Sequence, residues 1–285
     1  MQKNVRLLIV LGAIACGGTF ASGQKSVIAE QEKREELSAR ETTLVNNIAA
    51  ALKGRYDIPW ERVSADVRYP EWRLSLIKLP VRSIDSSFID VGKENAFTIS
   101  SKFLSDNAEV LGLAEVEFAE SRVFGNQVKG KIYSNEVTCH MNVNYEGVEI
   151  FGARVTTVFA DSFLVRVSLS VETRNLPAVE PTIDRDSAFR IASKLATKRT
   201  EDLKPIIGRQ DNMFGNPARS AEEMELDKGR LLIYSTRIFG EDGLPRLMWE
   251  LTISGKEPES FGASGTYFID AHSGEFLWRS SGRIE

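Results

Sequence analysis

The sequence predicts an α+β protein built of two modules, each with a helix packed on a curved antiparallel β-sheet. Helix-like and strand-like periodicities occupy separate stretches of the chain, which favours antiparallel sheets over a parallel βαβ fold. Two prolines in "NLPAVEPT", residues 175–182, separate a run of strands from a new helix and indicate a domain boundary. A chain of 285 residues can form two ordinary domains, each with its own core. We therefore predict modules at residues 55–175 and 176–285.

Residues 1–23 are typical of a secretory signal peptide. Lys3 and Arg6 precede the apolar run "LLIVLGAIA", and the small residues of "CGGTFASG" follow it. This pattern predicts cleavage after Ala21 or Gly23 and a secreted or periplasmic protein. The apolar run is short for a membrane span, and an uncleaved anchor is the alternative.

Cys16 offers a second interpretation of the same segment. "GAIAC" is similar to a bacterial lipobox, in which the cysteine is lipidated, and this would give a lipid-anchored envelope protein. The favoured interpretation is a cysteine that lies in the apolar run by chance. If cleavage removes Cys16, Cys139 is the only thiol left, and its alternation with Val137, Met141 and Val143 predicts a buried strand position rather than a nucleophile.

The charge distribution argues against a nucleic-acid partner. The formal net charge is −4, the isoelectric point is about 5.5, and no run of Lys and Arg with interleaved aromatic residues occurs. We therefore expect no nucleic-acid partner, and contact with a membrane only through the signal segment or a lipid anchor at Cys16.

The first module is predicted to follow a helix or stalk at residues 24–54. Leu37, Leu44, Ile48 and Leu52 recur at helical spacing, and Gly54 is the expected end. Short strands and loops are expected up to residue 94. A second helix is then predicted over residues 95–113. Its apolar face is given by three residues: Ala96, Phe103 and Leu104.

From residue 131 the apolar period becomes two, which is typical of half-buried strands. "EVTCHMNVNYEGVEIFGARVTTVF" predicts a strand, a turn at Glu146 and Gly147, and a second strand. In residues 163–174 one face is expected to be buried. Its members are Val165, Val167, Leu169 and Val171.

The second module is predicted to begin with an amphipathic helix in "DRDSAFRIASKLATK". Its apolar residues recur at the spacing of one helix face: Ala188, Ile191, Ala192, Leu195 and Ala196. Three strand-like segments follow: "RLLIYSTRIF", "RLMWELTIS" and "TYFIDAHSGEFLW".

The motifs of common enzymes are missing from the sequence. His140 and His272 are the only histidines, and neither lies in the His-Glu-x-x-His motif of zinc hydrolases. No Gly-x-Ser-x-Gly elbow or phosphate-binding glycine loop occurs. We predict no enzyme and no cofactor, although the sequence leaves open whether either histidine binds metal and whether two of the many carboxylates act as a pair.

The segment "GTYFIDAHSGEFLW" places four reactive side chains within six residues: Asp270, His272, Ser273 and Glu275. Strand-like alternation on both sides and Gly274 in the middle predict a β-hairpin whose turn brings these side chains together. Neighbouring hairpin residues point to alternating faces, so the segment favours a structural turn over a catalytic triad.

Several segments occur in the order found in propeptides of secreted thermolysin-like metalloproteases. Tyr145, Gly147, Val148, Phe151, Gly152 and Ala153 resemble the Tyr-x-Gly-Val-x-x-Phe-Gly-Ala motif of the fungalysin/thermolysin propeptide (FTP) module. "LPAVEPTIDRDSAFRIA", "RLMWELTIS" and "YFIDAHSGEFL" resemble the PepSY module, which has a cystatin-like sheet. The chain carries no protease domain after the last hairpin, so no catalytic residues of the family can be assigned to it.

The resemblance implies a non-catalytic, propeptide-like protein that inhibits a secreted metalloprotease in trans or assists its folding. The alternative is a cell-envelope module that binds another protein or ligand. The residues expected to contact a partner are Tyr145, Gly147, Phe151, Tyr267, Phe268, Asp270 and Gly274. For Phe151 and Phe268, packing in the core is the favoured interpretation.

Overall fold

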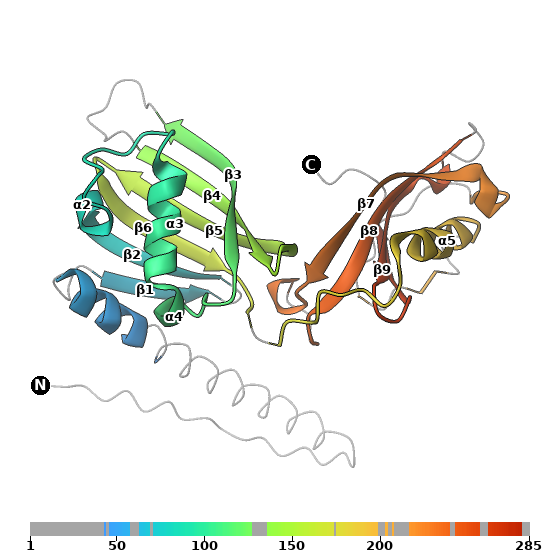
Figure 1. Ribbon diagram of the computed structural model, residues 1–285, viewed down its shortest axis with the longest axis horizontal. Helices are drawn as coiled ribbons and strands as arrows, with labels where there is room; N and C mark the ends of the chain where they lie inside the picture. The colour runs from blue at the N-terminus through green and yellow to red at the C-terminus, as the bar shows by residue number, and fades with distance from the viewer. Residues whose placement is uncertain are drawn as a thin grey trace, which may run out of the picture. The chain divides into compact units, whose positions relative to one another are not determined.

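A computed structural model of the chain describes an α+β protein (Figure 1). The described residues are 43, 46–57, 63–68, 71–126, 136–173, 175–198, 203–204, 207, 217–239, 243–256 and 262–280. Residues from 46 onwards group into one compact unit by their internal contacts. The predicted signal peptide, Cys16 and most of the predicted stalk lie outside the described residues.

Ten strands form one curled sheet in the order β1-β2-β6-β5-β7-β8-β9-β10, with β4 lying between β3 and β5. Only β5 and β7 pair in parallel among these strands. The bounds are β1 (Val63–Arg68), β2 (Glu71–Pro80), β3 (Glu117–Asn126), β4 (Glu136–Tyr145), β5 (Val148–Ala160), β6 (Phe163–Ser170), β7 (Met224–Tyr234), β8 (Arg246–Gly255), β9 (Gly265–Asp270) and β10 (Phe276–Ser280). The predicted α+β class is confirmed.

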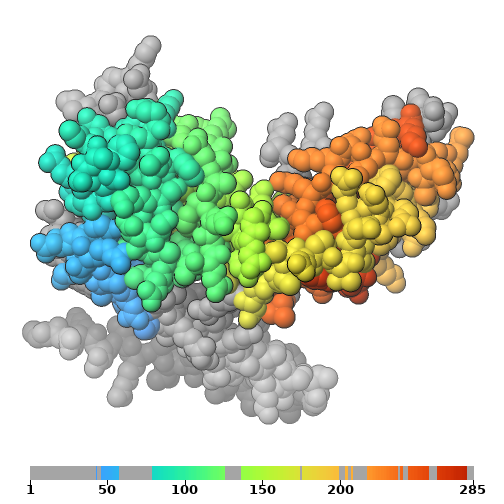
Figure 2. Space-filling view, viewed as in Figure 1, coloured from blue at the N-terminus to red at the C-terminus, as the bar shows by residue number. Residues whose placement is uncertain are grey.

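The helices are short. They are α2 (Val81–Ile84), α3 (Ala96–Asp106), α4 (Ala108–Leu111) and α5 (Arg185–Ala196), with 3-10 turns η3 (Ala221–Glu223) and η4 (Arg237–Phe239). Helices α3 and α5 pack against strands of the sheet, and their outer sides lie on the surface seen in Figure 2. Residues 46–56 are also helical, so this helix ends two residues beyond the predicted Gly54. Its Ile48 and Leu52 are buried in the same core as α3.

Helix α3 crosses one face of the sheet (Figure 1). The predicted apolar residues Ala96, Phe103 and Leu104 are all fully buried. A hydroxyl pair joins helix to sheet, because the oxygens of Ser100 and Thr157 lie 2.6 Å apart. The prediction of one helix over 95–113 is wrong.

The break between α3 and α4 occurs at Asn107. The side-chain amide of Asn107 donates to the carbonyl oxygen of Phe103 at 2.6 Å and to the Tyr56 hydroxyl at 2.8 Å. Asparagine competes with helical hydrogen bonds through such local contacts, so it ends α3 and connects it to the N-terminal helix.

The β4–β5 hairpin matches the prediction closely. Val137, Cys139, Met141 and Val143 are buried on alternate positions of β4. The turn has positive φ at Glu146 (47°) and Gly147 (79°), as a tight two-residue hairpin turn requires.

Strand β5 changes its neighbour at Gly152, where φ is 81°. Before this glycine, Glu149–Phe151 pairs with β7; after it, Arg154–Ala160 pairs with β6. A Cβ atom on Gly152 would lie 2.5 Å from the Phe239 ring, so glycine is required by both φ and space.

Strand β6 departs from the predicted alternation. A register shift between Val158 and Phe159 of β5 leaves Val165 without a paired residue, because Arg166 pairs with Val158 and Leu164 with Phe159. Leu164 is therefore fully buried and Val165 only half-buried. Val167 and Leu169 are buried as predicted.

The last third of the chain packs α5 on β7, β8 and β9, which are coloured yellow to red in Figure 1. Asp184 caps the helix, accepting from the Ser187 backbone N–H at 2.7 Å. The predicted apolar face is confirmed. Ala188, Ala192 and Ala196 are buried, while Ile191 and Leu195 pack against the same core.

Strand β7 begins at Met224, before the predicted segment at residue 230. A register shift between Leu226 and Lys228 interrupts its alternation and explains why the sequence pattern did not reveal this part. The predicted strand end "RIF" is the 3-10 turn η4.

Candidate functional site

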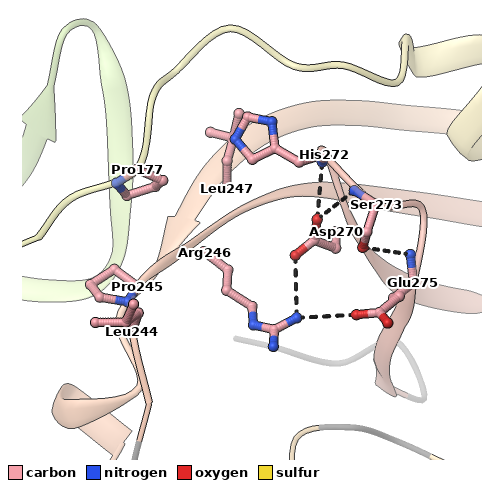
Figure 3. A pocket seen from close by; sticks show the side chains of 9 residues that line it. All are labelled: Pro177, Leu244, Pro245, Arg246, Leu247, Asp270, His272, Ser273 and Glu275. Atoms are coloured by element: carbon pink, nitrogen blue, oxygen red, sulfur yellow. Dashed lines mark hydrogen bonds and ion pairs between the residues drawn. The ribbon is translucent and has the colours of Figure 1, made fainter.

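The turn between β9 and β10 is held together by Asp270. Its Oδ1 atom accepts from the backbone N–H groups of His272 (3.0 Å) and Ser273 (2.8 Å), as Figure 3 shows. The Gly274 N–H donates to the Asp270 carbonyl at 2.9 Å, and Gly274 has φ 76°. The prediction of a hairpin turn is confirmed.

Arg246, at the start of β8, faces two carboxylates of this turn. Its Nη1 atom lies 3.4 Å from Asp270 Oδ2 and 3.3 Å from Glu275 Oε2. The Asp270 side chain is 9% exposed and that of Glu275 is 54% exposed, so the inner pair is shielded from water and the outer one is not. No local pattern in the sequence indicates Arg246, because its partners are 24 and 29 positions away.

An open hollow of about 410 Å³ lies beside this group (Figure 3). Its apolar side comes from the connecting segment and the start of β8, and its polar side from the turn. The lining residues are Pro177, Leu244, Pro245, Arg246, Leu247, Asp270, His272, Ser273 and Glu275. Leu244 is one of the two large apolar side chains that are most exposed among the described residues.

His272 connects the turn to the segment before α5. Its Nε2 atom lies 3.2 Å from the Ala178 carbonyl oxygen, and its Nδ1 atom lies 3.4 Å from the Thr182 hydroxyl. Ser273 Oγ accepts from the Glu275 N–H at 3.2 Å. None of these contacts joins the Ser273 hydroxyl to the His272 imidazole, and the described hydrogen bonds of Asp270 and Ser273 are those of a turn.

The residues of the FTP-like motif lie partly at the end of the β4–β5 hairpin and partly in an aromatic cluster. Tyr145 is half-buried at the end of β4, and the nearby Glu146 carboxylate, with some burial, raises its pKa. Phe151 lies in an aromatic cluster, with ring centroids 5.5 Å from Phe239 and 6.0 Å from Phe268. At the hairpin end Tyr145 is half-buried and Gly147 is exposed. Phe151 also remains half-buried, and of the motif residues only Ala153 is buried.

Tyr267 and Phe268 are fully buried and offer no surface to a partner. The Tyr267 hydroxyl donates to the Ala263 carbonyl at 3.0 Å, and burial raises the pKa of this phenol to about 12. Phe268 stacks on Trp278 with centroids 3.8 Å apart. Core packing, the favoured interpretation for Phe268, is confirmed.

Cys139 is buried in β4, as predicted. Burial raises the pKa of its thiol to about 11, so the reactive thiolate is scarce at neutral pH. Among the described residues, no group of three or more His, Cys, Asp or Glu is arranged to hold a metal ion. No described helix has the length and apolar character that a membrane-crossing helix needs.

No protein-family model and no curated protein matches this chain.

Proposed function

We propose that the chain is an exported, non-catalytic binding protein that acts in trans as an inhibitor or folding assistant of a secreted thermolysin-like metalloprotease. The proposal rests on the order of the FTP-like and PepSY-like segments. It is supported by the observation that the most reactive-looking group, Asp270, His272 and Ser273, is engaged in turn hydrogen bonds. A secreted or periplasmic location, or a lipid anchor at Cys16, belongs to the same proposal.

An exposed strand edge gives the proposed protein a physical means of binding. In the described sheet, β3 pairs with β4 alone and carries exposed residues along its length, whereas β10 is buried and its Leu277 carbonyl accepts from the Ile207 N–H at 3.3 Å. An edge strand presents N–H and C=O groups that can pair with an added strand of a partner. The hollow beside Arg246 borders the β9–β10 turn and would add side-chain contacts.

The test mixes the purified protein with thermolysin-like proteases from the same cells. We expect slower cleavage of a peptide substrate and a higher yield of active protease after refolding. The mass of the added protein must stay unchanged, because a protein that is merely digested would also compete with the substrate. A serine protease serves as the control enzyme, and the absence of inhibition, refolding assistance and binding would reject the proposal.

The second candidate is an envelope module that binds another protein or a ligand. The observation that favours it is the hollow of about 410 Å³, which offers a guanidinium, two carboxylates and the exposed Leu244 side by side. If the protease experiment fails, retention of an envelope component that depends on Arg246 would support this function.

A further inference from the structure

One face of the sheet formed by β3, β4, β5 and β6 carries a group of positive side chains. The opposite face is covered by α3, which contacts it through Thr157. Strand alternation turns even-numbered positions of β4 and β5 away from α3. The group consists of Arg122, His140, Arg154 and Arg166, and we call it the basic face. The three arginines are exposed, and His140 is half-buried.

The centre of the basic face is held in a fixed geometry. His140 Nδ1 lies 2.8 Å from the Thr156 hydroxyl on the neighbouring strand. Phe124 packs edge-on against the imidazole at 5.3 Å, and the Arg122 guanidinium lies 4.2 Å from the centre of the Phe124 ring. The hydrogen bond described for His140 uses Nδ1 and not Nε2.

The strand register places the cations around the imidazole. Arg122 of β3 is directly opposite His140. Arg154 of β5 is opposite Asn142, two residue pairs farther along β4 and on the same face. Arg166 of β6 pairs with Val158. None of the ion pairs described for the chain includes Arg122, Arg154 or Arg166, although the chain as a whole carries a net charge of −4.

The spacing of the cations selects the kind of ligand. Arg122 and Arg166 are three strand spacings apart across the sheet, about 14 Å, and Arg166 is also offset by two residues along its strand, so one small anion cannot reach both. An extended polypeptide with acidic side chains at alternate positions can place several carboxylates over this distance. Between the cations the face offers neutral hydrogen-bonding groups: Thr138, Asn142, Thr156, Ser168 and Ser170.

We propose that the basic face binds an acidic, extended polypeptide segment of a partner protein. Arg122, Arg154 and Arg166 receive its carboxylates, and His140 donates through Nε2 when it is protonated. This binding site goes beyond the proposed function, because it does not require the partner to be a metalloprotease.

The binding is expected to depend on pH. Burial, together with Arg154 from β5 and Arg122 from β3, lowers the pKa of His140, so the free imidazole is neutral at pH 7. Its neighbours on the same face of β4 are Thr138 and Asn142, which do not titrate. A bound carboxylate raises this pKa. Binding then takes up a proton and strengthens as the pH falls towards about 5.5, where the carboxylates of the peptide remain charged.

The experiment uses the full chain and a fluorescently labelled octapeptide of alternating Glu and Thr, with a Gln-Thr peptide as the neutral control. Fluorescence anisotropy measures both affinities at low salt. We expect the Glu peptide to bind about 10-fold more tightly or better, and Arg122→Gln or Arg154→Gln each to weaken it roughly 3- to 10-fold. Arg166→Gln provides a third independent variant.

Arg190→Gln is the matched control, because Arg190 is an exposed arginine of α5, away from these strands. Circular dichroism of each variant checks that the fold is intact. Equal affinity for the two peptides, or an equal loss in Arg190→Gln, would overturn the proposal. Binding of phosphatidylglycerol vesicles through the same arginines, without binding of the Glu peptide, would also overturn it and assign the face to a membrane surface.

The pH arm tests His140 separately. Affinity for the Glu peptide should rise between pH 7.5 and 5.5 in the wild type and stay nearly constant in His140→Gln. An unchanged rise in that variant would remove His140 from the site. Because the readout is peptide binding, it is independent of whether any protease is inhibited.

Discussion

At the residue scale, two glycines of the FTP-like motif have different structural roles. Gly147 and Gly152 both have φ near 80°, but a Cβ atom on Gly147 would meet nothing within 4 Å. A Cβ atom on Gly152 would lie 2.5 Å from the Phe239 ring. The motif therefore encodes both a turn and a site where an aromatic ring packs on the bare backbone.

We predict that Gly152→Ala destabilises the protein more than Gly147→Ala. The positive φ alone costs about 1–2 kcal/mol in either variant. Gly152→Ala must also displace the Phe239 ring, which adds roughly 1–3 kcal/mol. Urea denaturation measures both values. Equal losses would show that the ring moves away without cost, and Phe239→Ala should reduce the extra penalty if the clash causes it.

His140 gives a second prediction at this scale. Burial and the nearby Arg154 and Arg122 lower its pKa in the folded state, so the unfolded chain binds a proton more readily. Stability is thus expected to fall as the pH drops through about 6.5, the ordinary value for histidine.

Replacing His140 by Gln should remove this part of the pH dependence. The urea midpoint of the wild type at pH 7.5 and at pH 5.0 is compared with that of His140→Gln. His272→Gln controls for the loss of a histidine elsewhere. The same pH dependence in His140→Gln and the wild type would contradict the expectation.

At the element scale, the β9–β10 hairpin depends on one carboxylate. Asp270 Oδ1 accepts two turn N–H groups, and Oδ2 faces Arg246. We predict that Asp270→Ala costs about 1–2 kcal/mol, similar to the loss of a helix cap. Asp270→Asn keeps an acceptor oxygen and should lose less. Thermal or urea unfolding compares the two, and an equal loss would mean that attraction to Arg246 outweighs the turn hydrogen bonds.

Element by element, the sequence predicts what is local and periodic. The alternation around Cys139 located β4, and the spacing of Ala188, Ala192 and Ala196 located α5. The register shifts that displace Val165 from the core and hide the start of β7 depend on neighbouring strands, so a single-strand pattern cannot show them. Asn107 could have predicted the end of α3 from the sequence, because asparagine side chains bond to nearby backbone groups and so favour helix ends.

The candidate site was predictable only in part. Asp270, His272, Ser273 and Gly274 form the predicted turn, whereas Tyr267 and Phe268 proved to be core residues. Aromatic residues in a strand can face either the core or a partner, and alternation cannot distinguish the two when both faces of β9 are buried. Arg246 joins the site from a different strand, which only the tertiary structure reveals.

At the scale of the whole molecule, Arg230 joins three strands. From β7 it forms ion pairs with Glu250 of β8 and, at 2.9 Å, with Glu149 of β5. Burial opposes its charge, but the hydrogen bond to Glu250 and the attraction of both carboxylates raise its pKa overall. Both ion pairs lie beside the short parallel pairing of β5 with β7. They therefore strengthen the contact between these two strands, which is only three residue pairs long among the described residues.

We predict that Arg230→Gln costs about 1–3 kcal/mol, because the Glu250 side chain is only 12% exposed and would lose its charged partner. Lys102→Gln is the matched control. Its pair with Asp106 is exposed on α3, so a loss below about 0.5 kcal/mol is expected. Urea denaturation at low and high salt measures both, and losses of similar size would show that Arg230 contributes no more than a surface pair.

The parallel contact of β5 with β7 also has a kinetic consequence. Arg230 and Glu149 are 81 positions apart in the chain, whereas the β4–β5 and β9–β10 pairs close tight hairpins. Distant pairs form more slowly, because a long loop must close before any contact is gained. Refolding should therefore complete the hairpins before the long-range β2–β6 and β5–β7 pairs. Until then, the edge of β5 at Glu149–Phe151 is open to intermolecular pairing in the partly folded chain.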